Sequence, residues 1–388
     1  MDVYLTVMQI FGLTVAGMCH ALLGSVKVPL AKKLQIKEDR VGGLLSAFGF
    51  TTIPMAFAAG IFADAFGRQL VIITAFLMLI ASLLVLSRAS KYASALVAVL
   101  LLGVGWSALV NVLNVLQGDA FLPLFRDGAP LSSAMNFGDF IFGMGAFIMP
   151  IASAFMILKI QFRKTFISFA FLIAMPLLFV FLVDWQPLII ESAENSSLGI
   201  GTLLADQKVL ILCLAFFFYV GIEACTALWA TTLMIDQGMS IRRATTFLSV
   251  FWLTFTAARL VAAFLMPAGM DIPVLKALAL GCILCTVVLA LSRSELTTLI
   301  TIIIIALVMA PIFPILIAQL LGYVNTELGP ELGGRSVGLF FSIGGFGWAL
   351  APLLLGKVAI RFSVQKAFFV LASSAICLTI LVVMAATE

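Results

Sequence analysis

The chain has 388 residues, of which 63% are hydrophobic and only 10% are charged. Soluble domains carry about 25% charged residues, so this composition excludes a soluble globular protein and predicts an integral membrane protein. The net charge is only +4, and no basic cluster is interleaved with aromatic residues, which argues against a nucleic-acid partner.

Twelve apolar segments are long enough to cross a bilayer, which requires about 20 residues. We therefore predict an all-α membrane protein with two pseudo-symmetric bundles of six helices. The N-terminal bundle is residues 1–184, the central cytoplasmic linker is 185–206, and the C-terminal bundle is 207–388. The predicted spans are 3–28, 41–63, 70–87, 93–117, 132–158, 165–184, 207–235, 244–268, 274–292, 297–321, 335–360 and 366–386.

An internal repeat supports the division into halves. The pattern GxGxxxxP starts at Gly143 in the fifth span and at Gly345 in the eleventh, an offset of 202 residues. Small residues let helices approach closely in lipid, and a proline kink needs neighbouring helices to satisfy the freed backbone groups. Repeated six-helix halves with a site between them are typical of secondary transporters.

The first span carries two ionisable residues, His20 and Lys27, which share a helical face with Gly24. His20 is the only histidine and could titrate near neutral pH, so it is a candidate for proton coupling. Such a histidine more often bonds to a neighbouring helix. Lys27 is a candidate ligand for an anion near the outer mouth, or it extends its ammonium group to the membrane surface.

The loop after the second span reads GIFADAFGR from Gly60 to Arg68 and fits a gate. Gly67 allows a tight turn, Asp64 can cap a helix or form an ion pair, and Arg68 can reach a neighbouring helix. The loop resembles the G-x3-D-x2-G-R signature of the major facilitator superfamily. The resemblance implies that this loop and both chain termini are cytoplasmic.

The basic residues favour the opposite orientation. With the termini in the cytoplasm, five Lys and Arg residues lie at the cytoplasmic side and fifteen at the outer side. The positive-inside rule predicts the reverse. Because the loop signature is tied to a specific place in the fold, we expect cytoplasmic termini in a multi-pass protein of a bacterial inner membrane.

Neutral polar side chains follow one face of the fourth span, at Ser107, Asn111, Asn114 and Gln117. Amides offer both donors and acceptors, which suits an uncharged, polyhydroxylated ligand. We therefore take Asn111 and Asn114 as candidate substrate ligands. Hydrogen bonding between helices is the alternative.

Three further polar residues lie in the fifth and tenth spans. Asn136 is a candidate substrate ligand, and Asp139, three residues later on the same face, is a second candidate for coupling. Asp139 also fits a gate or a helix end. Gln319 is a candidate ligand by the amide argument, with helix packing as the alternative.

Glu223 is the only charged residue of the apolar run 209–234 in the seventh span. Holding a charge near the bilayer centre costs about 3 kcal/mol, so an acid there is by default a proton, ion or substrate site. Tyr219 and Thr226 share its helical face and could bond the carboxylate or a substrate hydroxyl. The alternative is a structural carboxylate locked to a neighbour such as Arg259.

Trp252 and Arg259 share a face of the eighth span. An arginine this deep in a membrane needs a partner or a water-filled cavity, and the tryptophan could stack on the apolar face of a pyranose. Both residues therefore join the candidate substrate ligands. A core tryptophan and an arginine that clamps two helices are the alternatives.

Several segments resemble the fucose, galactose and hexose symporter branch of this superfamily. They are FYVGIE at 218–223, NFG and FGMGA at 136–146, and PIFP at 311–314. The branch carries an acidic residue late in the first span, where this chain has Lys27. Proton coupling through an acid of the first span is therefore not implied.

We predict a secondary active transporter that moves a small polar solute by alternating access. A neutral sugar or polyol with proton coupling is the first hypothesis, and sodium is an open alternative to the proton. An organic-anion carrier or a proton-driven exporter is the second, suggested by Lys27 and Arg259. We expect a monomer in the bilayer, no enzymatic activity, no cofactor and no metal site.

Overall fold

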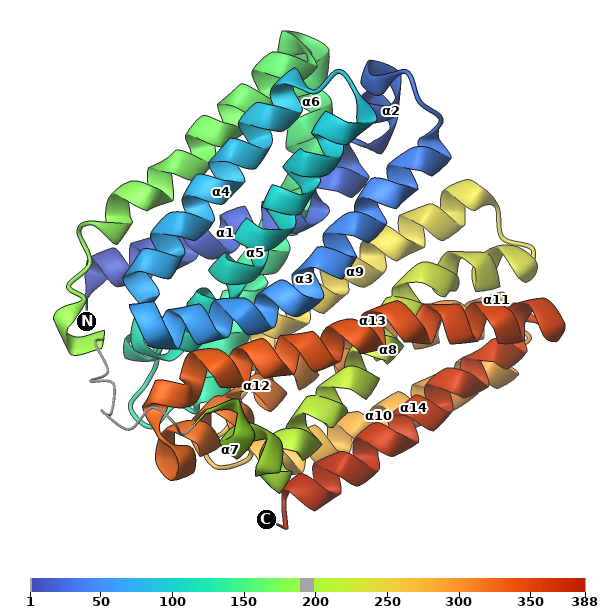
Figure 1. Ribbon diagram of the computed structural model, residues 1–388. Helices are drawn as coiled ribbons and strands as arrows, with labels where there is room; N and C mark the ends of the chain where they lie inside the picture. Colours follow the sequence, from blue (N-terminus) through green and yellow to red (C-terminus); the bar gives the residue numbers. More distant parts are fainter. Residues whose placement is uncertain (1, 189–198, 388) are drawn as a thin grey trace. The chain divides into compact units, whose positions relative to one another are not determined.

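The computed structural model describes residues 2–188 and 199–387, and its regular elements are all helical (Figure 1). The predicted linker, 185–206, lies partly outside the described residues. The helices are α1 (Val3–Ser25), α2 (Lys27–Leu34), α3 (Glu38–Phe66), α4 (Arg68–Arg88), α5 (Tyr92–Phe121), α6 (Leu131–Val180), α7 (Ile200–Ala205), α8 (Gln207–Asp236), α9 (Ile241–Leu265), α10 (Asp271–Leu291), α11 (Glu295–Met309), α12 (Ile312–Tyr323), α13 (Gly333–Arg361) and α14 (Val364–Ala385).

Eleven helical segments of the described chain are long and apolar enough to cross a membrane. One of them, α6, has 50 residues and would measure about 75 Å if straight, whereas a hydrocarbon core is about 30 Å thick. Its backbone leaves the helical region at Gln161, where φ is 67° and ψ is 160°. The predicted fifth and sixth spans lie on either side of this break.

Two other predicted spans are each interrupted. The first span, predicted as 3–28, ends as α1 at Ser25, and a separate helix, α2, follows from Lys27. His20 and Lys27 therefore do not share one continuous helical face as predicted. The tenth span, predicted as 297–321, is divided into α11 and α12 near Pro311, because a proline inside a helix has no N–H for the helical hydrogen bond.

The chain divides into two compact units. Unit 1 contains Met1–Leu124, Gly138–Leu198 and Val324–Ser342, and unit 2 contains Phe125–Phe137, Gly199–Tyr323 and Ile343–Glu388. The first turns of α6 therefore belong to unit 2 and those of α13 to unit 1, whereas the halves predicted from the sequence follow the chain without exchange. In unit 1, α5 packs against α1, α3 and α4; in unit 2, α14 packs against α8 and α10.

The repeated glycine pattern marks a close helix contact inside each unit. A Cβ added at Gly145 would lie 2.1 Å from the Thr14 carbonyl oxygen, and one added at Gly347 would lie 2.2 Å from the Phe217 carbonyl oxygen. Both distances are far below van der Waals contact, so neither position accepts a larger residue without separating the helices. The two copies of the repeat therefore make the same kind of close helix contact, between α6 and α1 in unit 1 and between α13 and α8 in unit 2.

Candidate functional site

Glu223 lies in the middle of α8 in unit 2 and is half-buried. Two side chains interact with its carboxylate. The hydroxyl of Tyr219, one turn earlier, forms a hydrogen bond with it, and the guanidinium of Arg259, from α9, attracts its charge. Tyr219 is completely buried and Arg259 is 9% exposed. The structure therefore brings together three residues that the sequence assigned to coupling and to substrate binding.

A backbone carbonyl at the break between α11 and α12 holds Arg259 in place. Its Nε donates a hydrogen bond to the Ala310 carbonyl oxygen at 3.2 Å, and its guanidinium lies 4.6 Å from the centre of the Phe255 ring. The helical partner of that carbonyl would be the N–H of Pro314, four residues later, which proline lacks. The break between α11 and α12 thus supplies an acceptor that fixes the arginine near Glu223.

Aromatic side chains of α9 lie beside Arg259 and form a further part of this site. Trp252 is 38% exposed and contacts the edges of Phe251 and Phe255, with ring centres 5.2 Å and 5.6 Å apart. Trp252 is therefore only partly covered by its aromatic neighbours. On α8, the Thr226 hydroxyl is buried and has no hydrogen-bond partner among the described residues. We call Tyr219, Glu223, Thr226, Trp252 and Arg259 the Glu223 site.

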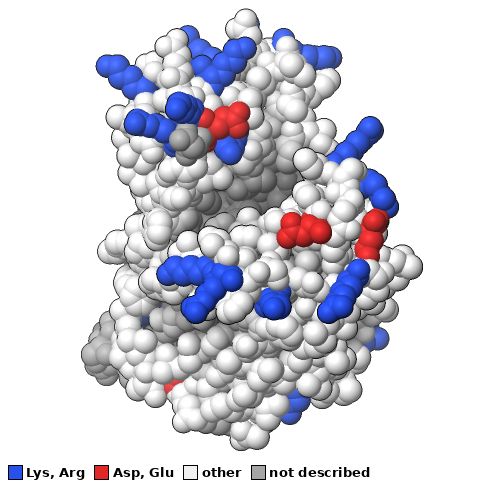
Figure 2. All heavy atoms as spheres, turned by 90° about the vertical axis from the view of Figure 1, so that its right-hand side faces the viewer, with Lys and Arg blue, Asp and Glu red and all other residues white. Residues whose placement is uncertain are grey.

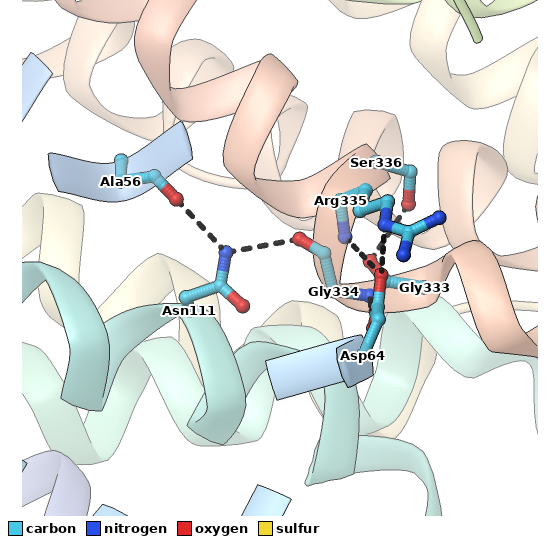
Figure 3. A network of polar contacts seen from close by, with 7 residues as sticks. All are labelled: Ala56, Asp64, Asn111, Gly333, Gly334, Arg335 and Ser336. Atoms are coloured by element: carbon cyan, nitrogen blue, oxygen red, sulfur yellow. Dashed lines mark hydrogen bonds and ion pairs between the residues drawn. The ribbon is translucent and has the colours of Figure 1, made fainter. Parts of the chain in front are cut away.

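The amides of α5 bond to the protein itself. Asn111 Nδ2 donates to the carbonyl oxygens of Ala56, at 3.4 Å, and Gly334, at 3.1 Å (Figure 3). Asn114 Nδ2 donates to Val110 in its own helix, and Gln117 Nε2 donates to Asn114. The Asn111 contacts fit the alternative given above for this stripe, hydrogen bonding between helices, whereas those of Asn114 and Gln117 stay within α5.

The predicted gate loop forms a cluster with the start of α13 (Figure 3). Asp64, near the end of α3, accepts hydrogen bonds from the backbone N–H groups of Gly334, at 2.9 Å, and Arg335, at 2.8 Å. The Arg335 side chain is 3.7 Å from the same carboxylate. The first N–H groups of a helix have no helical partner and attract negative charge, so a carboxylate is well placed there.

The other residues of the gate motif support this arrangement. A Cβ at Gly60 would lie 2.1 Å from the Gly334 carbonyl oxygen, so only glycine lets α3 approach α13 this closely. Gly67 has a φ of 89° and connects α3 to α4 in a turn that favours glycine. Arg68 begins α4 and is attracted by both Asp64 and Asp119, the second of which the sequence analysis did not single out.

A related cluster in unit 2 was missed from the sequence. Asp271, at the start of α10, accepts a hydrogen bond from Ser132 Oγ at 2.7 Å and another from Gln319 Nε2 at 3.3 Å. The glycine repeat offered a signal. With its offset of 202 residues, Ser132 is the position equivalent to Gly334, whose N–H donates to Asp64. Gln319 thus bonds to a carboxylate outside the Glu223 site.

Two further candidates, Asn136 and Asp139, lie in α6. Asn136 Nδ2 donates to the Ser132 carbonyl of its own helix, and Asp139 is 7% exposed in α6. Both lie before Gln161 in α6. Within the described ranges, no group of three His, Cys, Asp or Glu side chains could hold a metal ion.

His20 and Lys27 lie in unit 1. His20 is exposed on α1, with its ring centre 5.4 Å from that of Trp106 and 5.8 Å from that of Phe142. Lys27 is the first residue of α2 and is half-exposed. The structure gives His20 aromatic neighbours from α5 and α6, which suit a ring-stacking surface.

Comparisons with known proteins agree on the family and the fold. A family model described as Major Facilitator Superfamily matches residues 10–352. FucP, the E. coli fucose:proton symporter, solved in the outward conformation, has 16% identity, covers 97% of both chains and gives a TM-score of 0.80.

Two other solved transporters align over nearly the whole chain. The human organic anion transporter MFSD10 has 16% identity, covers 98% of this chain and 99% of its own, and gives a TM-score of 0.73. The proton:xylose symporter XylE has 13% identity, covers 97% and 94%, and gives 0.74. A comparison with curated protein sequences finds no match. At these identities the structural likeness shows the fold alone.

Proposed function

Because the chain belongs to the Major Facilitator Superfamily, a family of membrane transporters and not of enzymes, we propose that it is a proton-coupled symporter of a small polar solute. The predicted family and the all-helical membrane fold are both confirmed. The observation that carries the coupling proposal is the Glu223 site, where a half-buried carboxylate in the middle of a membrane helix is opposed by one buried guanidinium.

The proposed coupling follows from charge balance. With Glu223 ionised, it and Arg259 form a pair without net charge, which a membrane interior tolerates better than either ion alone. Protonation of Glu223 removes the attraction and leaves the Arg259 guanidinium with fewer acceptors. A solute oxygen then fills the vacant place, so proton and solute bind together and leave together.

For the solute, we propose a neutral hexose or polyol. The exposed part of the Trp252 indole could stack on the apolar face of a sugar ring, and the Thr226 hydroxyl on α8, which has no hydrogen-bond partner among the described residues, could bond a sugar hydroxyl. FucP and XylE are described as symporters of fucose and xylose with protons, which agrees with this proposal without deciding it.

We propose that the Asp64 cluster holds one state of the transport cycle. In unit 1 the carboxylate joins the end of α3 to the start of α13, so transition to the other state would require these backbone hydrogen bonds to open. As the signature loop implies, we place this loop and both termini in the cytoplasm. The Asp271 cluster would play the same part in unit 2 for the start of α6.

An organic anion is the second candidate solute, with Arg259 as its ligand and Lys27 as an attracting charge. The specific observation in its favour is that the amide donors of Asn111 and Asn114 are occupied by backbone carbonyls, which leaves fewer groups for sugar hydroxyls. MFSD10, described as an organic anion transporter, has the same fold.

Uptake into proteoliposomes with an imposed pH gradient tests the proposal. A panel of labelled hexoses and polyols would be offered with and without a protonophore, and unlabelled carboxylates and phosphorylated sugars would be added as competitors. We expect accumulation of a neutral solute that the protonophore abolishes and that the anions do not inhibit. Accumulation that occurs without a pH gradient, or that anions block, would reject the coupling or the neutral solute respectively.

A further inference from the structure

One end of unit 1 carries a group of basic side chains from two helices, α2 and α6. Figure 2 shows many Lys and Arg side chains, and few Asp and Glu side chains, on one face of the protein. Lys33 comes from α2, and Lys159, Arg163 and Lys164 surround the bend of α6 at Gln161. None of these four cations forms an ion pair with any carboxylate whose side chain the structure describes. We call them the basic group.

Lys33 is the fixed member of the basic group. Its Nζ donates to the backbone oxygens of Ser87, at 2.7 Å, and Leu86, at 3.4 Å, where α4 ends, and it lies 4.4 Å from the centre of the Phe162 ring. Burial, together with the nearby Arg163 guanidinium, holds the pKa of Lys33 below its usual range. Like charges held together in this way favour an anion between them.

A shallow apolar cleft opens in the same unit, along α1, α4 and α6. It contains no polar lining and is open to the outside, since Leu172 is 40% exposed. Its lining residues come from α1, α4 and both parts of α6: Met18, Cys19, Leu22, Leu83, Met149, Phe169, Leu172 and Ile173.

The cleft and the basic group are neighbours. Leu83, in the cleft, is four residues before Ser87, which Lys33 binds, and four helical residues span about 6 Å. Along α6, Phe162 stacks on Phe166 at 4.5 Å, and Phe166 contacts Phe169, a cleft residue, at 6.2 Å. The aromatic rings of Phe162, Phe166 and Phe169 therefore connect Lys33 to the cleft.

We propose that this end of unit 1 is a binding site for one anionic phospholipid. The phosphate lies against Arg163 and Lys164 beside the ammonium group of Lys33, and an acyl chain lies along the shallow cleft formed by α1, α4 and α6. Basic pockets between membrane helices bind anionic headgroups in this way. A soluble anion would use the cations but not the cleft, and a neutral lipid would use the cleft but not the cations.

The bound lipid would join α2, the end of α4 and both parts of α6. These are the elements that meet where the α6 backbone departs from helical geometry, so the lipid would brace this bend in addition to Lys33 and the ring contacts. The proposal concerns the outer surface of unit 1 and is independent of the solute and of the coupling residue.

The test uses the purified full-length protein stripped of lipid. Phosphatidylglycerol, phosphatidylcholine and inorganic phosphate are added separately, and bound lipid is counted by native mass spectrometry while thermal unfolding is followed. We expect phosphatidylglycerol alone to bind and to raise the unfolding temperature. An equal shift with inorganic phosphate would overturn the lipid assignment in favour of a free-anion site, and an equal shift with phosphatidylcholine would overturn the role of the cations.

Two variants and a control locate the site. The double variant Arg163→Gln with Lys164→Gln removes two exposed cations and should weaken phosphatidylglycerol binding about tenfold or more, at about 1 kcal/mol for each charge. Leu172→Trp fills the cleft from its exposed rim and should also reduce binding. The matched control, Arg242→Gln with Lys366→Gln, removes two exposed cations from unit 2 and should leave binding unchanged. Equal losses in the double variant and the control would refute a specific site.

Discussion

The two acids that the sequence placed at the centre of function, Asp64 and Glu223, are held by different kinds of partner. Asp64 accepts two hydrogen bonds from backbone N–H groups at the start of α13, at 2.9 Å and 2.8 Å. Glu223 is opposed by side chains, the Tyr219 hydroxyl and the Arg259 guanidinium. Backbone donors move only when a whole helix moves, whereas side chains can separate by rotation.

This difference assigns the two acids different tasks. A carboxylate bonded to a helix start reports the position of that helix, so Asp64 suits a gate that is made or broken as a unit. A carboxylate opposed by one cation responds to a proton, so Glu223 suits coupling. The Asp271 cluster shares one feature with each acid. Like Asp64, Asp271 is bonded at the start of a helix, α6; like Glu223, its partners are side chains, those of Ser132 and of Gln319 on α12.

Removing the cation of the Glu223 site should have the largest effect on stability. Arg259→Ala leaves a half-buried carboxylate without its cation and the Ala310 carbonyl without a donor, and breaking a buried pair costs about 3–5 kcal/mol. Thermal unfolding in detergent measures the loss. Adding Glu223→Gln to Arg259→Ala should restore part of it, since no uncompensated charge remains; an unchanged or larger loss in the double variant would contradict the pairing.

The Asp64 cluster should rank next. Asp64→Ala removes acceptors from two N–H groups at the start of α13 and is expected to cost about 3 kcal/mol in the state described here, since hydrogen bonds to charged groups contribute about 1.5–3 kcal/mol each and water replaces part of them. Labelling of a cysteine introduced at Ser336, completely buried here, measures how often the cluster opens. Asp64→Ala should label faster than the same cysteine protein with Asp64 intact; equal rates would exclude a gate role.

The smallest effect is expected at the Asp271 cluster. Ser132→Ala removes one of two side-chain donors and leaves Gln319, so the cost should be about 1.5 kcal/mol. A comparison of unfolding temperatures with Ser133→Ala, a neighbouring serine with no bond to Asp271, isolates the contact. If both variants lose the same stability, the two clusters are not functional counterparts.

Sequence reasoning recovers the membrane spans because each needs only a long apolar run, and most predicted boundaries lie within a few residues of the observed helices. It also pairs Glu223 with Arg259, since an ion in lipid demands a partner. The breaks at Gln161 and near Pro311 are harder. Proline signals the second, whereas the positive φ of Gln161 is marked by neither a glycine nor a proline at that position.

Contacts between distant segments account for what the sequence could not decide. Whether Asn111 faces a ligand or a helix depends on the carbonyl of Gly334, 223 residues away, which no local pattern reveals. Asp271 reads as an ordinary acidic residue in the first turn of a helix, and only its contact with Ser132 distinguishes it. Local patterns thus identify polar groups inside the membrane, and the fold decides which of them are already hydrogen-bonded within the protein.

The most direct test of the account separates solute binding from proton coupling in Glu223→Gln. Proteoliposomes containing the transported solute are assayed for counterflow at equal pH and for accumulation driven by a pH gradient, with Asp139→Asn as the matched acid-to-amide control. We predict that Glu223→Gln retains counterflow and loses accumulation, while Asp139→Asn keeps both. Accumulation that persists in Glu223→Gln, or that is lost instead in Asp139→Asn, would contradict the assignment of coupling to Glu223.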